Sequence, residues 1–299
     1  MSSTTRDERP LRRLGFLGPP GTFTGQALVA MLEPAESAVA DLVPLHGSPA
    51  VLAAVREGLV DAGCVPLENS VEGAVPPVLD GLTEDPPLAI IREAVLAVRF
   101  ALIVRPGTTT EGIRAVASHS HGIAQTRDWI TTHLPAAEVR IASSTSEGAA
   151  QVARGEVDAA VSSPLAAREH GLEILVHDIA DHPGAVTRFA LVARLGVTPA
   201  PTGRDRTTLA LAVENRPGSL VTLLREFALR DIDLTRIESR PVRNRPGNYW
   251  FHLDCAGHVE EPAVGEALAA LRRRGAHVRN LGSYPRADTP QPPVGTGHR

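Results

Sequence analysis

A short helix–strand unit occurs twice in this chain of 299 residues. Gly58-x-Val60-Asp61-Ala62 matches Gly155-x-Val157-Asp158-Ala159, and the offset, 155 − 58, is 97 positions. The same offset relates three further positions: Ala53 to Ala150, Val55 to Val152 and Ser48 to Thr145. Chance similarity between two ordinary helix–strand units is the alternative. As a repeat, the pattern predicts two similar α/β lobes with a ligand cleft between them.

A segment rich in proline, glycine and charge divides the chain. Residues 194–206 (RLGVTPAPTGRDR) lie between two apolar runs and are typical of a linker. They separate segments of about 180 and about 80 residues, as expected for a two-domain chain of this length. The polar ends, residues 1–13 and 286–299, are expected to be disordered tails.

The first segment alternates strands and helices. A strand over residues 14–17 leads through the turn 18–21 into a helix that Thr22 or Thr24 could cap. Two further helices are indicated. One begins at Ser48-Pro49, with Ser48 as its N-cap, and the other has a capping box made by Ser144 and Glu147. The helix after Ser48 has four apolar residues on one face and precedes a strand over 60–65; those residues are Val51, Leu52, Val55 and Leu59.

The second segment has the order strand, helix, strand, strand, helix, strand. The strands are expected at residues 209–213, 232–237, 249–255 and 278–281, with a hairpin turn at 245–248. The two helices are indicated by apolar residues at helical spacing: Leu220, Leu223, Leu224 and Phe227, then Val264, Leu268 and Leu271. This pattern predicts a ferredoxin-like βαββαβ module.

Composition and charge restrict the cellular role. The net charge is −4 with a pI near 6.3, which favours neither nucleic acid nor an anionic membrane as partner. No stretch approaches the ~20 apolar residues of a membrane span, and the N-terminus lacks an apolar signal region. Cys64 and Cys255 lie in apolar strand-like segments and are expected to be buried thiols. A cytoplasmic location follows as an expectation.

Several polar stretches could carry chemistry, and each has a plainer structural interpretation. Val65–Gly73 follows a strong strand, so its polar residues could face a cleft or simply cap a turn. His119 and His121 are two apart with no third ligand at zinc-like spacing, and we expect no metal site. Ser118 is interpreted as a helix cap or a substrate donor.

Arg188 stands directly before an apolar strand, where an unpaired charge would be costly. Its planar guanidinium suits a carboxylate. From the residues alone, the favoured partner of Arg188 is an acid such as Asp178 or Asp181 in a structural ion pair, and a substrate anion is the alternative.

Seven motifs in order resemble those of a known enzyme family. GPPGTFTGQAL (18–28), VPLENSVEGAV (65–75), SHSHGIAQ (118–125) and VTRFALV (186–192) resemble the signatures of prephenate dehydratase. ENRPGSLV (214–221), IESRP (237–241) and LGSYP (281–285) resemble the phenylalanine-sensing ACT domain. The resemblance implies an α/β catalytic domain at 14–193, two-lobed and of periplasmic-binding-protein type II. Its lobes would be about 14–92 with 175–193, and 93–174. An ACT domain of ferredoxin-like fold would occupy 207–285.

The resemblance also implies a reaction and its residues. Prephenate would lose water and CO2 to give phenylpyruvate, without metal or organic cofactor. Thr187 would donate a hydrogen bond or proton to the departing hydroxyl, and Arg188 would pair with a substrate carboxylate or hold the loop. Asn69 and Ser70 complete the catalytic set. The residues implied for substrate binding are Thr22, Glu68, Ser118, Gln125 and Phe189, although Glu68 and Glu72 also suit an orienting role.

Regulation and assembly are implied in the same way. The family binds phenylalanine at a dimer interface, in motifs that match Asn215, Pro217, Gly218, Ser219, Leu220, Val221, Glu238, Ser239, Arg240 and Pro241. A homodimer or homotetramer is therefore expected. With only about 13 residues before the first strand, no chorismate mutase domain is expected.

Four residues depart from the family pattern, namely Ala185, Ser120, His121 and Ser219. Arogenate dehydratase and a non-catalytic amino-acid sensor remain alternatives to prephenate dehydratase.

Overall fold

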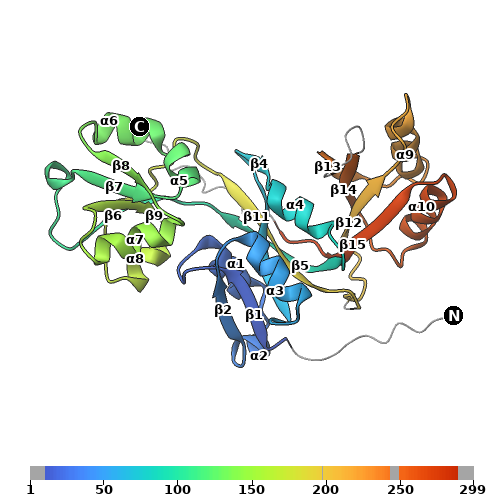
Figure 1. Ribbon diagram of the computed structural model, residues 1–299, viewed down its shortest axis with the longest axis horizontal. Helices are drawn as coiled ribbons and strands as arrows, with labels where there is room; N and C mark the ends of the chain where they lie inside the picture. The colour runs from blue at the N-terminus through green and yellow to red at the C-terminus, as the bar shows by residue number, and fades with distance from the viewer. Residues whose placement is uncertain (1–10, 197, 243–248, 289–299) are drawn as a thin grey trace.

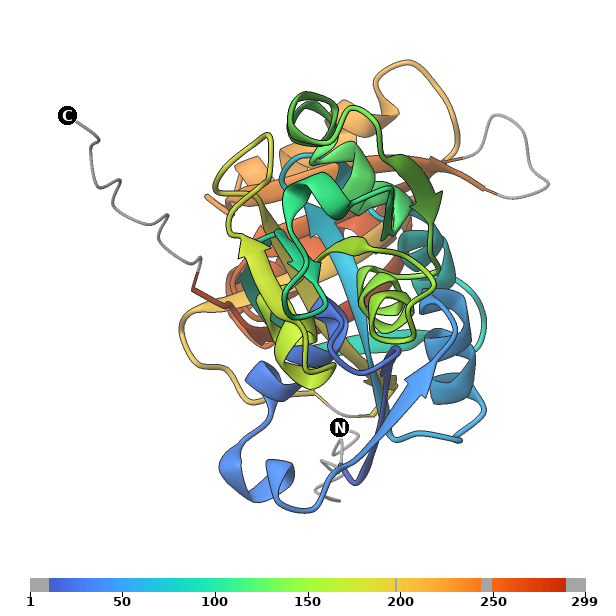
Figure 2. The same ribbon diagram turned by 90° about the vertical axis from the view of Figure 1, so that its left-hand side faces the viewer.

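The computed structural model describes residues 11–196, 198–242 and 249–288. The predicted hairpin turn at 245–248 and most of both tails lie outside these ranges. Three bodies lie in a row in Figure 1: lobe 2, lobe 1 and a C-terminal domain. Seen from the lobe 2 end, the three bodies lie one behind another (Figure 2).

Lobe 1 is a mixed sheet with the strand order β2-β1-β3-β11-β5, and a short β4 also pairs with β3. Helices cover both of its faces. The N-cap of α1 is Thr22, one of the two caps predicted from the sequence. The strands are β1 (Arg13–Leu17), β2 (Asp41–Leu45), β3 (Ala62–Asn69), β4 (Gly73–Ala74), β5 (Leu88–Ala97) and β11 (Val186–Arg194). The helices are α1 (Phe23–Met31), α2 (Pro34–Ser37), α3 (Ser48–Arg56) and α4 (Pro76–Leu82).

Lobe 2 is a second sheet with the strand order β10-β6-β9-β7-β8. Its strands are β6 (Ala101–Val104), β7 (Ala115–Ser118), β8 (Glu138–Ile141), β9 (Ala159–Ser162) and β10 (Glu173–Val176). Its helices are η1 (Thr110–Gly112), α5 (Ser120–Ala124), α6 (Arg127–His133), α7 (Thr145–Ala153) and α8 (Pro164–Glu169).

The chain crosses between the lobes twice, and both crossings differ from the predicted lobe bounds of 92 and 175. β5 stays in the lobe 1 sheet as far as Ala97, and β10 stays in the lobe 2 sheet as far as Val176. Ala97 and Val186, the two ends of the crossing, are direct partners in the antiparallel ladder of β5 and β11. Lobe 2 is therefore inserted between two neighbouring strands of lobe 1.

The repeat is present in three dimensions. α7 begins and ends 97 residues after α3, since 145 − 48 and 153 − 56 both equal 97, and β9 starts 97 residues after β3, since 159 − 62 is also 97. Asp61 Oδ2 accepts hydrogen bonds from the backbone N–H groups of Arg12 and Arg13, and Asp158 Oδ2 accepts the equivalent pair from Arg114 and Ala115. Asp61, just before β3, thus holds the start of β1, and Asp158, just before β9, holds the start of β7.

Some local expectations need correction. Gly47, not Ser48, is the N-cap of α3, because Ser48 already lies inside the helix. Leu59 lies beyond the end of α3 and is exposed, since Gly58 turns the chain with a φ of 73°. Ser144 caps α7 as predicted, whereas the Glu147 carboxylate pairs with Arg154.

The C-terminal domain is a four-stranded antiparallel sheet with the order β13-β14-β12-β15, as a βαββαβ chain gives. Its elements are β12 (Asp205–Ala212), α9 (Ser219–Ala228), β13 (Leu234–Pro241), β14 (Tyr249–Ala256), α10 (Pro262–Arg273) and β15 (His277–Pro285).

This domain is docked on lobe 1 through a shared hydrophobic core. Leu281 and Tyr284 of β15 belong to the same buried cluster as Ile90 of β5 and Val192 of β11. Gly282 lies so close to the backbone of Ile90 that a Cβ on it would clash with that carbonyl. The polypeptide after Pro285 continues along this boundary, so residues 286–288, predicted as tail, are ordered there.

Candidate active site

The strand pair β3–β11 presents different residues on its two faces. Thr187 is directly opposite Asn69, and Arg188 is directly opposite Glu68. Since successive side chains on a strand point to opposite faces, these are two separate pairs. The Thr187 side lies with Phe189 in the cluster under α1, and the Arg188 side lies with Ala190 in the cluster shared with the C-terminal domain.

The Thr187 hydroxyl is held by Asn69. Asn69 Nδ2 donates to Thr187 Oγ1 at 2.9 Å. Asn69 Oδ1 accepts from the backbone N–H groups of Val71 at 2.8 Å and Glu72 at 3.1 Å. Because these two donors fix the amide orientation, its NH2 group must face Thr187. The hydroxyl oxygen therefore receives a hydrogen bond from Asn69, and among the residues that the structure describes no acceptor takes its own proton.

Ser70 holds the start of β11 through two hydrogen bonds to Val186. Its backbone N–H donates to Val186 O at 2.9 Å, and its Oγ accepts from the Val186 N–H at 3.0 Å. The residue before Thr187 is thus bonded on both backbone groups to one residue of lobe 1. This explains locally why Asn69 and Ser70 belong with Thr187.

Glu72 links the Thr187 site to lobe 2. Its Oε1 accepts from Gln125 Nε2 at 2.9 Å, and its Oε2 lies 3.1 Å from His121 Nδ1. His119 packs edge-on against His121, and burial, together with His121, lowers the pKa of His119. Of these lobe 2 residues, the sequence prediction included Gln125 and missed His121 as a partner.

Three other predicted substrate residues have structural partners. Thr22 Oγ1 donates to Leu17 O at 2.7 Å and accepts from Gly25 N–H as the cap of α1. Ser118 is fully buried and donates to Val161 O at 2.7 Å, while His119 is the N-cap of α5. Phe189 is 2% exposed in the lobe 1 core. The structure thus gives Ser118 no capping role, and it places Phe189 away from any surface.

Arg188 is directed away from Thr187 and toward the C-terminal domain. It pairs with Asp254 at 2.5 Å, Glu93 at 3.3 Å and Glu68 at 3.5 Å. The expected pairing with a substrate carboxylate is therefore corrected, because carboxylates of the protein surround this guanidinium. The prediction that Asp178 or Asp181 pairs with Arg188 is wrong too, since other acids pair with it. Asp181 instead accepts hydrogen bonds from backbone N–H groups of α6.

Sequence reasoning missed Asp254 and Glu93, the two buried acids that pair with Arg188. A signal existed for Asp254: it is a charged residue inside the apolar strand YWFHLDCA, the same feature that drew attention to Arg188. Glu93 in LAIIREAVLA offers a comparable signal. The pairing of Arg188 with Asp254 could not be predicted from these signals, because the two residues are 66 positions apart and lie in different domains.

The predicted effector residues divide into two groups. A cavity of about 140 Å³ is lined by Asn215, Gly218, Ser219, Leu220 and Val221 of the first motif, together with Tyr249 and Phe251 of β14. Glu238–Pro241 lie on the edge strand β13. There the guanidinium of Arg240 pairs with Asp80 of lobe 1 at 2.9 and 3.0 Å and is turned away from the cavity.

Within the described ranges, no three His, Cys, Asp or Glu side chains gather as a metal site would require. No helix there combines the length and apolar character needed to span a bilayer. The large cavity of about 1250 Å³, bounded by Met31, Arg92, Ala193 and Pro285 among others, contains none of the predicted catalytic residues.

Comparisons with known proteins agree with this architecture. Residues 14–196 match the family Prephenate dehydratase, and residues 207–273 match the ACT domain. A prephenate dehydratase of Mycobacterium tuberculosis is 48% identical over 290 residues, 94% of this chain and 90% of that protein.

Two solved structures are also similar. A prephenate dehydratase from Arthrobacter aurescens in complex with L-Phe has a TM-score of 0.84 and 42% identity, covering 94% of this chain and 92% of that one. A quorum-quenching acylase, GqqA, has a TM-score of 0.79 and 30% identity, covering 92% of this chain and 98% of that one. The fold alone thus does not fix the chemistry.

The fold and these comparisons together define a two-lobed α/β lyase that carries a ferredoxin-like regulatory domain. Both family matches lie in the order that the motifs predicted, and relatives match across most of the chain. The chain belongs to the prephenate dehydratase family, and its C-terminal domain is an ACT domain.

Proposed function

We propose that this enzyme converts prephenate to phenylpyruvate, CO2 and water, with Thr187 assisting departure of the ring hydroxyl. The observation that carries this proposal is the Asn69–Thr187 hydrogen bond, which leaves the hydroxyl proton of Thr187 available. Family membership supports the substrate, and the site supplies the donor that the reaction needs.

The reaction is driven by aromatisation. The ring carboxylate leaves as CO2, its electron pair enters the ring, and the hydroxyl at the opposite ring carbon departs with a proton as water. A donor at the leaving oxygen typically contributes 10²–10⁴-fold. Threonine is a weak acid, so a fixed hydrogen bond from Thr187 to the leaving oxygen, preorganised by Asn69, is the role we assign.

The remaining predicted site residues have supporting parts. Ser70 fixes the strand start beside Thr187, and Glu72 holds Gln125 and His121 of lobe 2 close to lobe 1. Glu68 and Arg188 face the ACT domain instead. The substrate carboxylates therefore need partners other than Arg188.

Purified enzyme should form phenylpyruvate from prephenate, and this product is measured by its absorbance in alkali. Thr187→Val keeps the β-branched shape and removes the hydroxyl, so kcat should fall roughly 10²-fold or more. Thr187→Ser keeps the hydroxyl and is the matched control, with kcat within about tenfold of wild type. Equal rates for the Val and wild-type enzymes would remove Thr187 from the mechanism.

Arogenate and an N-acyl homoserine lactone are the comparison substrates in the same assay. Arogenate differs from prephenate in a substrate amine, and the lactone tests the activity in the name of the GqqA relative. Turnover of either in preference to prephenate would replace the proposed substrate.

We further propose that phenylalanine is the allosteric effector and that it binds at the cavity beside Gly218 and Ser219 in a homodimer or homotetramer. The L-Phe complex of the Arthrobacter relative supports the ligand. Exposed apolar residues around that cavity and along the free edge strand β13 support a second copy as partner; these are Val221, Ile237 and Tyr249. Light scattering on the purified enzyme tests this, and a monomer would contradict it. A cytoplasmic location stays a prediction.

A further inference from the structure

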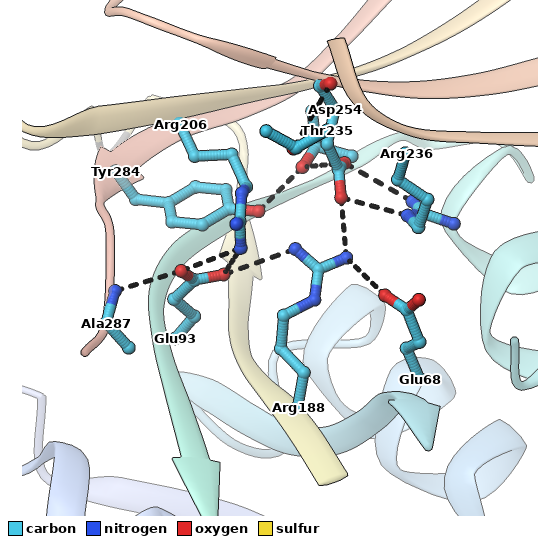
Figure 3. Close-up of polar contacts among 10 residues, drawn as sticks. Glu68, Glu93, Arg188, Arg206, Thr235, Arg236, Asp254, Tyr284 and Ala287 are labelled. Atoms are coloured by element: carbon cyan, nitrogen blue, oxygen red, sulfur yellow. Dashed lines mark hydrogen bonds and ion pairs between the residues drawn. The ribbon is translucent and has the colours of Figure 1, made fainter. Parts of the chain in front are cut away.

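A cluster of six charged side chains lies at the boundary between lobe 1 and the ACT domain (Figure 3), beside a cavity of about 170 Å³. Asp254 of β14 accepts from Arg188 Nη2 at 2.5 Å and from Arg236 Nε at 2.9 Å. Glu93 of β5 accepts from Arg206 at 2.6 and 2.8 Å and pairs with Arg188 at 3.3 Å. Arg188 therefore joins an acid of each domain.

The cluster is buried except at Glu68, whose side chain is 41% exposed, and its charges balance. The side chains of Glu93 and Asp254 are 0% and 1% exposed, and that of Arg188 is 9% exposed. Three guanidinium groups, of Arg188, Arg206 and Arg236, face three carboxylates, of Glu68, Glu93 and Asp254. Removing one member of such a group leaves an uncompensated charge in a nonaqueous environment, which is strongly unfavourable.

The ionic states are held in place by these neighbours. Burial acts to raise the pKa of Asp254, but Arg188 and Arg236 outweigh it and hold that pKa well below its usual range. The second oxygen of Asp254 accepts from Thr208 Oγ1 at 2.8 Å, and Thr208 in turn bonds to the Tyr284 hydroxyl at 2.6 Å. Asp254 is thus an anion with a fixed position in the ACT sheet.

The backbone connects this cluster both to the candidate catalytic residue and to the effector cavity. Arg188 follows Thr187 in β11, so a shift of its backbone moves Thr187 against Asn69. Asp254 lies in β14, three residues after Phe251, which lines the cavity beside Gly218 and Ser219. One strand of the ACT domain therefore extends from the effector cavity to the partner of Arg188.

We infer that Asp254 is a positioning residue for catalysis: by holding Arg188, it fixes the start of β11 and hence the hydroxyl of Thr187. This inference rests on the proposed function. Effector binding that displaces β14 weakens the Asp254–Arg188 contact and lets Thr187 lose its alignment. The ACT domain thereby takes part in positioning the catalytic hydroxyl.

Asp254→Asn, made in the full-length enzyme, tests the inference because the amide keeps the shape and removes the charge. Its kcat should fall at least tenfold, close to the rate of wild type saturated with L-Phe, while KM for prephenate changes less than about threefold. L-Phe should still bind, as measured by calorimetry, but should inhibit the variant less than twofold further. A merely structural role would not abolish the response to a bound effector.

Asp85→Asn is the matched control. It removes another ion pair between the domains, that of Asp85 with Arg279 at 3.0 Å, which lies after α4 and not on β11. Its kcat and its inhibition by L-Phe should stay within twofold of wild type. Thr208→Val removes one hydrogen bond to Asp254 and leaves every charge in place, so it should lower kcat two- to fivefold without changing KM.

The outcomes separate the two proposals. If wild type makes no phenylpyruvate from prephenate, the proposed function fails before any variant is examined. If wild type is active and Asp254→Asn retains kcat within twofold, or is inhibited by L-Phe as strongly as wild type, the inference about Asp254 is wrong. If Asp254→Asn does not fold, Thr208→Val decides, and wild-type kinetics for that variant overturn the inference.

Discussion

At the scale of single residues, the direction of one hydrogen bond matters most. Asn69→Asp would be nearly isosteric, and its carboxylate could still accept from Val71 and Glu72. The carboxylate cannot donate to Thr187, so the Thr187 hydroxyl would donate its proton to residue 69 instead of to the leaving group. We expect kcat to fall roughly 10²-fold with little change in KM. Steady-state kinetics check this, and a kcat within twofold of wild type would contradict the assigned hydrogen-bond direction.

At this scale, the contacts in the structure agree with one predicted grouping of side chains and disagree with another. The pairing of Thr187 with Asn69 agrees with their joint assignment to one site. Arg188 was misassigned because adjacency in the chain was treated as adjacency in the site, whereas a strand sends neighbouring side chains to opposite faces. The alternation was readable in VTRFALV; the partner on the far face was not, since it comes from another domain.

At the scale of elements, the close passage of β15 over β5 is set by one glycine. Gly282 has a φ of 130°, and a Cβ there would clash with the backbone of Ile90. Gly282→Ala should therefore lower the free energy of unfolding by about 1–3 kcal/mol or more, because the two strands would have to separate. Denaturant titration measures the loss.

Gly275→Ala provides the comparison for that variant. Gly275 also has a positive φ, 79°, but no atom lies within 4 Å of a Cβ placed on it. It should show only the cost of the left-handed backbone, about 1–2 kcal/mol. Equal losses for the two variants would mean that contact with Ile90 adds nothing.

The elements themselves were largely predictable. The 97-residue repeat and the βαββαβ order both depend on local periodicity and turn residues, which a single sequence contains. The errors lie at ends, such as the cap at Gly47 and the crossing points after Ala97 and before Val186. Those ends depend on which sheet a strand joins, and that is decided by long-range pairing.

At the scale of the whole molecule, the two domains share one hydrophobic core. Ala210, Leu281 and Tyr284 of the ACT domain are buried with Ile90 and Val192 of lobe 1. A chain ending near residue 200 would expose that surface of lobe 1, so it should aggregate or unfold roughly 10 °C lower than the full chain. A test of effector response on such a fragment would thus confuse regulation with stability.

Cleavage of the linker is the sharper version of that experiment. A protease site placed between residues 198 and 203 would cut the connection and leave both domains present. The nicked enzyme should elute as one species and keep its response to L-Phe, because the core and ion pairs hold the domains together. Separation of the fragments on a sizing column would contradict this account of the boundary.

The pairing of Ala97 with Val186 in one ladder has a consequence for engineering of the chain. Everything between these residues forms a self-contained sheet with its own helices, and its entry and exit points are neighbouring positions of one antiparallel ladder. A two-residue reverse turn could span that gap. Lobe 2 is therefore organised like a cassette in the first lobe, exchangeable in principle without breaking the sheet that joins Thr187 to the ACT domain.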